Sequence, residues 1–155
     1  FRNLLEYPNK TCYHTHTMMT LPPDTIIAAG PVIIEDGKVL LNRSKNSKGQ
    51  ESPYFMFPGG KMEDFASTLE ETCMREVREE LGIDITILRP LKTIFAKRVD
   101  TDSYVFLVHY LAKRIGEVTP ANETVEWGWF DVHNLPNVTP NVKEVLDAYF
   151  SEPSV

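Results

Sequence analysis

Three glutamates that fall on one face of a predicted helix constrain this chain more than any other feature. Glu76, Glu79 and Glu80 stand at positions i, i+3 and i+4, which are neighbours on a helix surface. Like charges this close destabilise a helix unless something compensates them. A hard divalent cation, which prefers oxygen ligands, is the obvious compensation. For three glutamates taken alone, the alternatives are a solvated acidic face and a calcium-binding or protein-interaction helix.

The residues around these glutamates predict a packed helix with defined ends. An apolar stripe on the adjoining face, by which the helix packs on a core, consists of Cys73, Val77 and Leu81. Two capping boxes fit the helix start, Ser67-x-x-Glu70 and Thr68-x-x-Glu71. Gly82 fits a left-handed cap at the helix end. We therefore expect a helix of about four turns with Cys73 as a buried thiol.

Composition predicts a single globular domain that binds neither nucleic acid nor membranes. The chain has 155 residues, of which 42% are hydrophobic and 25% charged, enough for one real core. A net charge of -6 argues against a general nucleic-acid or membrane-surface binder. It does not exclude a phosphorylated small molecule, because a bound metal inverts the local field. Without a signal peptide or a long apolar run, we expect a cytoplasmic protein, monomeric or homodimeric.

The pattern along the chain predicts an α/β fold, with a mixed sheet flanked by helices. We divide it into an N-terminal extension (1–24), one domain (25–150) and a C-terminal tail (151–155). An Asp-Gly turn within 35–38 predicts a hairpin, and Pro31 suggests a bulge or an edge position. The predicted strands are 25–34, 39–43, 54–57, 83–97 (one or two strands, broken at 89–90), 102–112 and 125–130. The second predicted helix is 141–150.

Two other groups of residues carry less weight. Cys12, His14 and His16 lie close together, but no second ligand pair follows at zinc-type spacing. With only two cysteines in the chain, a disulfide framework is also excluded. His109 lies inside a predicted strand, and we interpret it as a packed or edge histidine, not a catalyst.

The glycine turn and the acidic helix together resemble the signature of the Nudix family. Gly59-Gly60-Lys61 is followed by the string from Arg75 to Ile83, and that string matches R-E-U-x-E-E-x-G-U at all seven specified positions, where U is aliphatic. The resemblance covers roughly Thr25 to Phe150, with Phe-Pro-Gly-Gly before the motif and E-x-x-E-x-x-W-F after it. It implies an α/β/α sandwich whose mixed sheet is flanked by helices. It also implies hydrolysis of a nucleoside diphosphate linked to another moiety.

Carried over residue by residue, the resemblance implies a metal site. It implies that Glu76, Glu79 and Glu80 hold Mg²⁺ or Mn²⁺, with the carbonyl of Gly59 as a further ligand. It also implies that Arg75 orients the glutamates and does not touch the substrate.

The chain departs from the signature at one position. The expected first glutamate falls on Ser67 when counted back from Arg75, and on Ala66 when counted forward from Gly60. The loop is therefore one residue longer than in the signature, and the acid is missing. Ser67 is a candidate helix cap instead. The candidates for a substitute partner of Arg75 are Glu63, Asp64 and Glu70.

Hydrolysis of a pyrophosphate also needs a base and groups that bind the substrate. Divalent ions neutralise the phosphate oxygens and lower the pKa of bound water, and a nearby carboxylate takes its proton. By resemblance Glu123 is the first candidate for this base, Glu126 the second, and Glu79 a third. The cations that are candidates for binding phosphate oxygens are Arg43, Lys61 and Lys97-Arg98. The aromatic residues that are candidates for stacking on a base are Phe55, Tyr104 and Trp127.

These observations predict a metal-dependent pyrophosphohydrolase that acts on a nucleoside triphosphate or a similar small nucleotide. One alternative is a nucleotide-sugar or ADP-ribose pyrophosphatase. The other is a catalytically weakened nucleotide-binding or regulatory module, which the missing glutamate suggests and the intact set of three glutamates opposes.

Overall fold

The computed structural model describes residues 20–45, 48–98 and 101–151. Within these ranges the chain forms six strands and two helices. The strands are β1 (Ile26–Glu35), β2 (Lys38–Ser44), β3 (Gly60–Lys61), β4 (Asp84–Lys97), β5 (Tyr104–Ile115) and β6 (Thr124–Asp131). The helices are α1 (Leu69–Leu81) and α2 (Pro140–Ser151).

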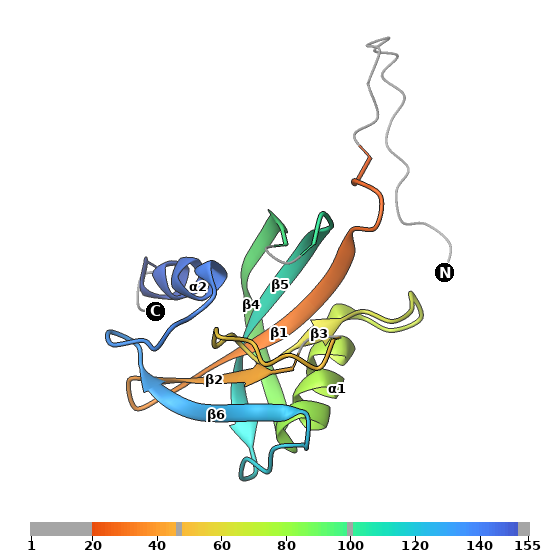
Figure 1. Ribbon diagram of the computed structural model, residues 1–155. Coiled ribbons are helices and arrows are strands. Elements are labelled where there is room, and N and C mark those ends of the chain that lie inside the picture. Colours follow the sequence, from red (N-terminus) through yellow and green to blue (C-terminus); the bar gives the residue numbers. More distant parts are fainter. Residues whose placement is uncertain (1–19, 46–47, 99–100, 152–155) are drawn as a thin grey trace, which may run out of the picture.

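The strands form one mixed sheet that lies between the two helices (Figure 1). Its order is β4-β5-β1-β2-β6, and β3 pairs with β1. The pair β1–β5 is parallel, whereas the other strand pairs are antiparallel. The predicted α/β/α sandwich with a mixed sheet is confirmed.

Alternation of side chains along the strands gives the sheet a core on each face. In β1, Ala29 and Ile33 belong to the core under α1, whereas Val32 belongs to the core under α2. Helix α1 contributes the predicted stripe of Cys73, Val77 and Leu81, all fully buried. Helix α2 contributes Val142, Val145 and Leu146. Burial raises the pKa of the Cys73 thiol to about 12, which agrees with its predicted role as a buried thiol.

The predicted ends of α1 are confirmed, and one of the two capping boxes is selected. Thr68 is the N-cap: its hydroxyl accepts a hydrogen bond from the Glu71 amide at 3.1 Å, and the Glu71 carboxylate accepts one from the Thr68 amide at 2.7 Å. Gly82 is the left-handed C-cap, with φ 65°. The alternative that Ser67 caps the helix is wrong, because Ser67 lies one residue before the cap.

The predicted hairpin turn is confirmed, with positive φ at Asp36 and Gly37. Three other local predictions are corrected by the structure. Pro31 is not on an edge strand, because β1 is interior. It lies between the segments of β1 that pair with β3 and with β2, where its missing N–H does no harm. Residues 54–57 form isolated bridges and no continuous strand. Residues 84–97 form a single strand that shifts register around 87–92 and is not broken.

Some predictions fall outside the described residues. Cys12, His14 and His16 lie there, as does most of the predicted extension 1–24. None of the helices in the described ranges has the length and apolar character needed to cross a membrane.

His109 is packed, as predicted, in the core under α2. It is 2% exposed, its ring lies 4.9 Å from that of Phe57, and its Nε2 lies 3.4 Å from the side-chain nitrogen of Asn141. Among the described residues no hydrogen-bond partner reaches its Nδ1. Burial lowers the pKa of His109 from 6.5 to about 4, because the charged ring loses its solvation.

The pKa of His109 predicts a loss of stability in acid. The unfolded chain binds the proton at pH 6.5 and the native chain only near pH 4, so the unfolded state holds more protons in this window. The free energy of unfolding therefore falls as pH falls from 6.5 to 4, by at most about 3 kcal/mol from this residue. Urea unfolding at several pH values should show a smaller acid-dependent loss in His109→Leu than in the wild type. Equal pH slopes in both proteins would contradict the prediction.

The choice between the two capping boxes is tested by a matched pair of variants. Thr68→Ala removes the hydroxyl that accepts from Glu71, and we expect it to lower the free energy of unfolding by about 1 kcal/mol. Ser67→Ala, one residue earlier, should leave it unchanged within about 0.5 kcal/mol. Urea denaturation of both variants measures the difference. A larger effect at Ser67 than at Thr68 would show that the helix begins one residue earlier.

Candidate functional site

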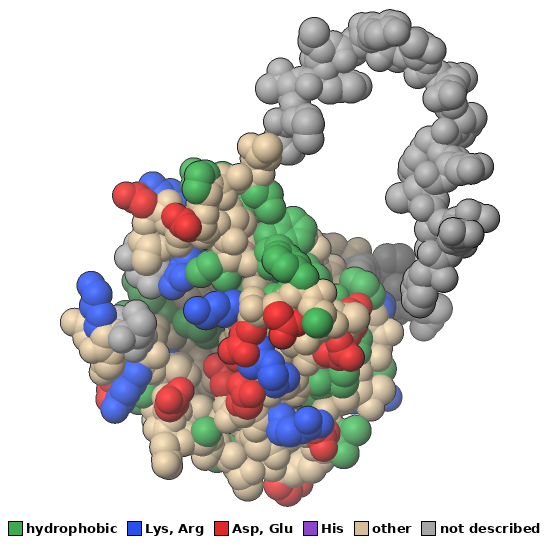
Figure 2. Space-filling view, turned by 90° about the vertical axis from the view of Figure 1, so that its right-hand side faces the viewer, with side chains coloured by type: hydrophobic (Ala, Val, Ile, Leu, Met, Phe, Trp, Pro, Cys, Tyr) green, Lys and Arg blue, Asp and Glu red, His purple; other side chains and the backbone are tan. Residues whose placement is uncertain are grey.

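The glutamates of α1 lie beside the glycine turn because β3 pairs with β1. Gly60 is opposite Ala29 in this antiparallel pair. The pairing places the turn next to the face of α1 that carries the glutamates. Figure 2 shows acidic and basic side chains gathered on the face of the molecule that carries α1 and β3. The structure thus brings together the glycines and the glutamates of the predicted site.

Glu80 is tied to the turn by its carboxylate. Its Oε2 accepts hydrogen bonds from the backbone amide of Gly59 at 3.0 Å and from the side-chain nitrogen of Asn42 at 3.3 Å. Burial raises the pKa of Glu80 to about 7, although both hydrogen bonds act to lower it. The cost of removing the carboxylate from water therefore exceeds what the two donors return.

Arg75 lies between the other two glutamates. Its guanidinium pairs with Glu76 at 2.8 Å and with Glu79 at 3.0 Å, and donates to the carbonyl of Lys61 at 3.2 Å. The side chain of Glu76 is only 15% exposed, and burial raises its pKa against the opposing effect of Arg75. These contacts suit the predicted role of Arg75 in orienting the glutamates.

The two glycines are required for different reasons. A Cβ on Gly60 would lie 2.3 Å from the carboxylate of Glu76, so the missing side chain makes room for that carboxylate. Gly59 has φ 142°, and a Cβ there would lie 2.5 Å from the carbonyl oxygen of Ala29. Gly59 is thus required by the backbone conformation of the turn, and Gly60 by the space that the Glu76 carboxylate occupies.

A loop between β5 and β6 closes the C-terminal end of α1. The carbonyl of Glu80 accepts from the amide of Ala121 at 3.0 Å and from the hydroxyl of Thr124 at 2.9 Å. The carbonyl of Leu81 accepts from the amide of Thr119 at 2.8 Å. Glu123 lies between Ala121 and Thr124, so the bonds of these two residues place it near the C-terminal end of α1. Glu123 is exposed. Glu126 lies further along β6 and pairs with Arg43 at 2.8 Å.

The donors at this site suit a hard divalent cation, although they are not gathered as ligands in this structure. In the described part of the chain, no three Asp, Glu, His or Cys side chains surround a common point. The guanidinium of Arg75 instead takes up Glu76 and Glu79. The donor set nevertheless consists of carboxylate oxygens whose negative charges repel each other and are partly removed from water. Such a set fits Mg²⁺ or Mn²⁺.

The loop that lacks the first signature glutamate is held by other contacts. Asp64 accepts hydrogen bonds from the amides of Ala66 and Ser67 at 2.7 and 3.0 Å. Glu70 bonds to Tyr110. Of the three proposed substitutes, only Glu63 acts electrostatically on Arg75. The ion-pair partners of Arg75 are instead Glu76 and Glu79, two of the glutamates that it was predicted to orient.

The predicted substrate-binding cations lie in different places. Arg43 pairs with Glu126 and, at 3.5 Å, with Glu51, and its guanidinium lies over the Phe55 ring. Lys61 is exposed beside the glycine turn. Arg98 lies at the far end of β4, where its amide donates to the carbonyl of Ser103. These three cations therefore do not converge on one point.

The predicted stacking aromatics are largely structural. Phe55 is 8% exposed in the core under α2, and Trp127 packs against the core under α1. Tyr104 stacks on Phe95 at 5.4 Å between ring centroids.

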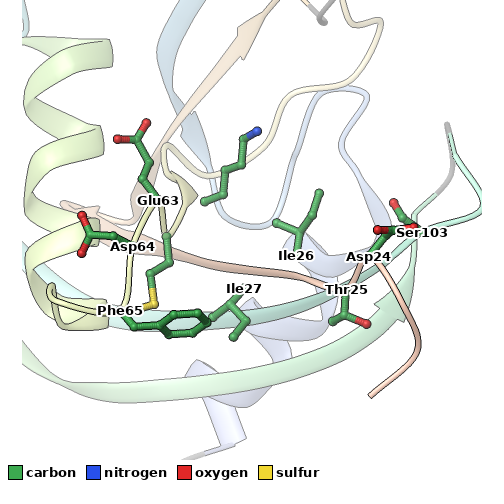
Figure 3. Close-up of a pocket in the computed structure, with 10 residues that line it drawn as sticks. Asp24, Thr25, Ile26, Ile27, Glu63, Asp64, Phe65 and Ser103 are labelled. Atoms are coloured by element: carbon green, nitrogen blue, oxygen red, sulfur yellow. The ribbon is translucent and has the colours of Figure 1, made fainter. Parts of the chain in front are cut away.

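An open cleft of about 480 Å³ includes Lys61, the residue that follows the glycine turn. It lies between the start of β1 and the loop after β3. Figure 3 shows Phe65 beside Ile27 across this cleft. Its lining residues are Asp24, Thr25, Ile26, Ile27, Lys61, Met62, Glu63, Asp64, Phe65 and Ser103.

Asn42 is the site residue that sequence reasoning missed. It is 2% exposed in β2, where it directly follows the buried apolar run Val39-Leu40-Leu41, and an amide buried there needs a polar partner. A polar residue at the end of an apolar run was the available signal. Its partner is 38 residues away, so the sequence did not identify it.

Comparisons with known proteins identify the family of the chain. Residues 24–149 match the family model of the NUDIX domain. The ADP-ribose pyrophosphatase of Methanocaldococcus jannaschii is 27% identical over 124 residues, which is 79% of this chain and 72% of that protein. The 8-oxo-dGTP diphosphatase of Proteus vulgaris is 37% identical over 68 residues, 44% of this chain and 59% of that protein. The crystal structure of a MutT NUDIX hydrolase from Burkholderia pseudomallei is similar with a TM-score of 0.71 and 26% identity, over 80% of this chain and 97% of that one.

Fold, site and comparisons define an α/β/α hydrolase that acts on pyrophosphate bonds. The chain belongs to the Nudix family. Members of this family generally use divalent metal ions, which agrees with the donor set described above.

Because the two glycines are required for different reasons, we expect Gly60→Ala to lower activity and Gly59→Ala to lower stability. In Gly60→Ala the new methyl group meets only the end of the flexible Glu76 side chain. We expect little change in Tm but a fall of about 100-fold in kcat/KM, because the carboxylate is displaced. Gly59→Ala meets backbone at a positive φ and should lower the free energy of unfolding by roughly 1–3 kcal/mol. Thermal melts and assays of both variants check this. A Gly60→Ala enzyme with wild-type kcat/KM would contradict it.

Proposed function

We propose that the protein hydrolyses the pyrophosphate linkage of a nucleoside diphosphate derivative, with a nucleoside triphosphate or a similar small nucleotide as its substrate and Mg²⁺ (or Mn²⁺) as its cofactor. The observation that carries this proposal is the partly buried pair of Glu76 and Glu80, which is held against the turn of Gly59 and Gly60. Carboxylates kept close together and out of water are stabilised by a cation.

The residues of the chain have separate duties in this proposal. Glu76, Glu79 and Glu80, with the carbonyl of Gly59, would hold the divalent ion. The bound ion would neutralise phosphate oxygens and lower the pKa of a bound water molecule. Arg75 already contacts both Glu76 and Glu79. It would keep these carboxylates oriented while they bind the divalent ion.

Glu123 is our proposed proton acceptor. It is exposed, and its loop is bonded to the carbonyl of Glu80 on either side of it. Glu126, the second candidate, is engaged with Arg43, so it would have to give up an ion pair before accepting a proton. Glu79 is engaged with Arg75 in the same way.

Two substrate classes have specific support. A nucleoside triphosphate is favoured by the 37% identity to an 8-oxo-dGTP diphosphatase, although that match covers only 44% of this chain. ADP-ribose is favoured by the longer match, over 79% of this chain, to an ADP-ribose pyrophosphatase. Action in the cytoplasm, as a monomer or a homodimer, stays a prediction.

A substrate panel with product analysis tests this proposal. The panel contains the common nucleoside triphosphates, 8-oxo-dGTP, ADP-ribose and a nucleotide sugar, each with Mg²⁺, with Mn²⁺ or with EDTA. We expect metal-dependent release of pyrophosphate and a nucleoside monophosphate from a triphosphate. Release of AMP and ribose 5-phosphate would assign ADP-ribose instead. No turnover of any compound with either metal would sink the proposal and favour the weakened binding module.

Glu→Gln substitutions then distinguish the metal ligands from the proton acceptor. Glu79→Gln and Glu80→Gln should abolish turnover, since each removes a metal-binding charge. Glu123→Gln should lower kcat by roughly 10²–10⁴-fold without weakening metal binding, whereas Glu126→Gln should have a much smaller effect. Glu144→Gln, on α2, is the matched surface control. The reverse order of effects at 123 and 126 would identify Glu126 as the base.

A further inference from the structure

Asn42 is a buried polar residue that the proposed reaction does not yet use. It is 2% exposed, and its backbone amide and carbonyl both pair with Met56, at 3.0 and 2.9 Å. The strand contacts are therefore complete without its side chain. Burial of a free amide group costs free energy unless it finds a partner. Its side-chain nitrogen finds that partner in the carboxylate of Glu80, at 3.3 Å.

The position of this contact on the carboxylate is informative. Asn42 and the amide of Gly59 donate to the same oxygen, Oε2 of Glu80. The two donors come from different elements, β2 and the turn before β3, and so restrict rotation of the carboxylate more than either would alone. Among the described residues no donor is recorded for Oε1. One oxygen is thus held by the protein, and the other is left for a cation.

We propose that Asn42 is a positioning residue for the metal site: it fixes the Glu80 carboxylate through Oε2 so that Oε1 serves as the ligand of the divalent ion. The inference rests on the proposed function, because it takes Glu80 as a metal ligand. It assigns to β2 a part in a site otherwise built from α1 and the glycine turn. Asn42 acts through Glu80 and does not touch the substrate.

The test measures binding of Mn²⁺ alone, by electron paramagnetic resonance, in protein without nucleotide. Asn42→Leu removes the donor and keeps a side chain of similar size. We expect it to weaken Mn²⁺ binding by roughly 10–100-fold, as loss of a residue that orients a metal ligand usually does. In assays, the metal concentration for half-maximal activity should rise by a similar factor, while kcat at saturating metal changes little. Asn42→Thr, which suits a strand but has too short a hydroxyl, should behave in the same way and covers the case in which Asn42→Leu does not fold.

Two controls separate positioning from general damage. Thr72 is equally buried, at 2%, and its hydroxyl bonds to the carbonyl of Thr68. Thr72→Val should therefore lose stability but keep wild-type Mn²⁺ affinity. In a Glu80→Gln background, Asn42→Leu should weaken binding no further, because the residue acts only through Glu80.

Each outcome decides the matter. Wild-type Mn²⁺ affinity in folded Asn42→Leu or Asn42→Thr would overturn the inference, and so would an equal additional loss in the Glu80→Gln background. Wild-type protein that binds Mn²⁺ but hydrolyses no nucleotide would overturn the proposed function and leave the comparison at Asn42 intact. Wild-type protein that binds no Mn²⁺ in the absence of nucleotide would overturn the inference at Asn42, while turnover in the substrate panel would still decide the proposed function.

Discussion

The contact between the Glu80 carboxylate and the amide of Gly59 is the interaction on which the site depends. It joins the last turn of α1 to the glycine turn. A hydrogen bond to a charged group contributes about 1.5–3 kcal/mol, yet the pKa of Glu80 stays raised, near 7. Desolvation therefore outweighs the donors, and the glutamate is held in place at a net cost in stability.

The remainder of the fold supplies the stability that offsets this cost. Helix α1 packs on the sheet through Cys73, Val77 and Leu81, which are fully buried. Its N-terminus is capped by the reciprocal hydrogen bonds of Thr68 and Glu71. Because packing and capping hold the helix, its exposed face is free to carry three acids. Arg75 neutralises two of them at short range but leaves Glu80 to the backbone and to Asn42. The arrangement favours any ligand that brings positive charge to this face.

The sequence predicted the features that depend on local pattern. The limits of α1 follow from a capping box and a glycine, and both are confirmed. The shared face of the glutamates follows from helix periodicity, and the mixed sheet follows from the order of the elements. Which of two overlapping capping boxes is used, at Ser67 or at Thr68, is decided by tertiary context that local sequence does not contain.

The features that the sequence did not predict depend on contacts between distant residues. Residues 54–57 have the composition of a strand but pair only at single positions, with Asn42 and Val138. Pro31 is tolerated in an interior strand because its neighbours on one side, β3 and β2, leave a gap. The hydrogen bond from Asn42 to Glu80 likewise has no local signature. The roles of the site residues in metal binding and catalysis stay predictions.

The loop that carries Glu123 is tied to the same residue as the glycine turn. The carbonyl of Glu80 would be unsatisfied at the end of an isolated helix, and here Ala121 and Thr124 satisfy it. One residue thus connects three parts of the site: its carboxylate holds the turn and Asn42, and its carbonyl holds the loop of the proposed base. A shift of the last turn of α1 would therefore move Glu80, the proposed metal ligand, and Glu123 together. This coupling gives a physical reason to prefer Glu123 over Glu126, whose ion pair with Arg43 connects it to β2 and not to α1.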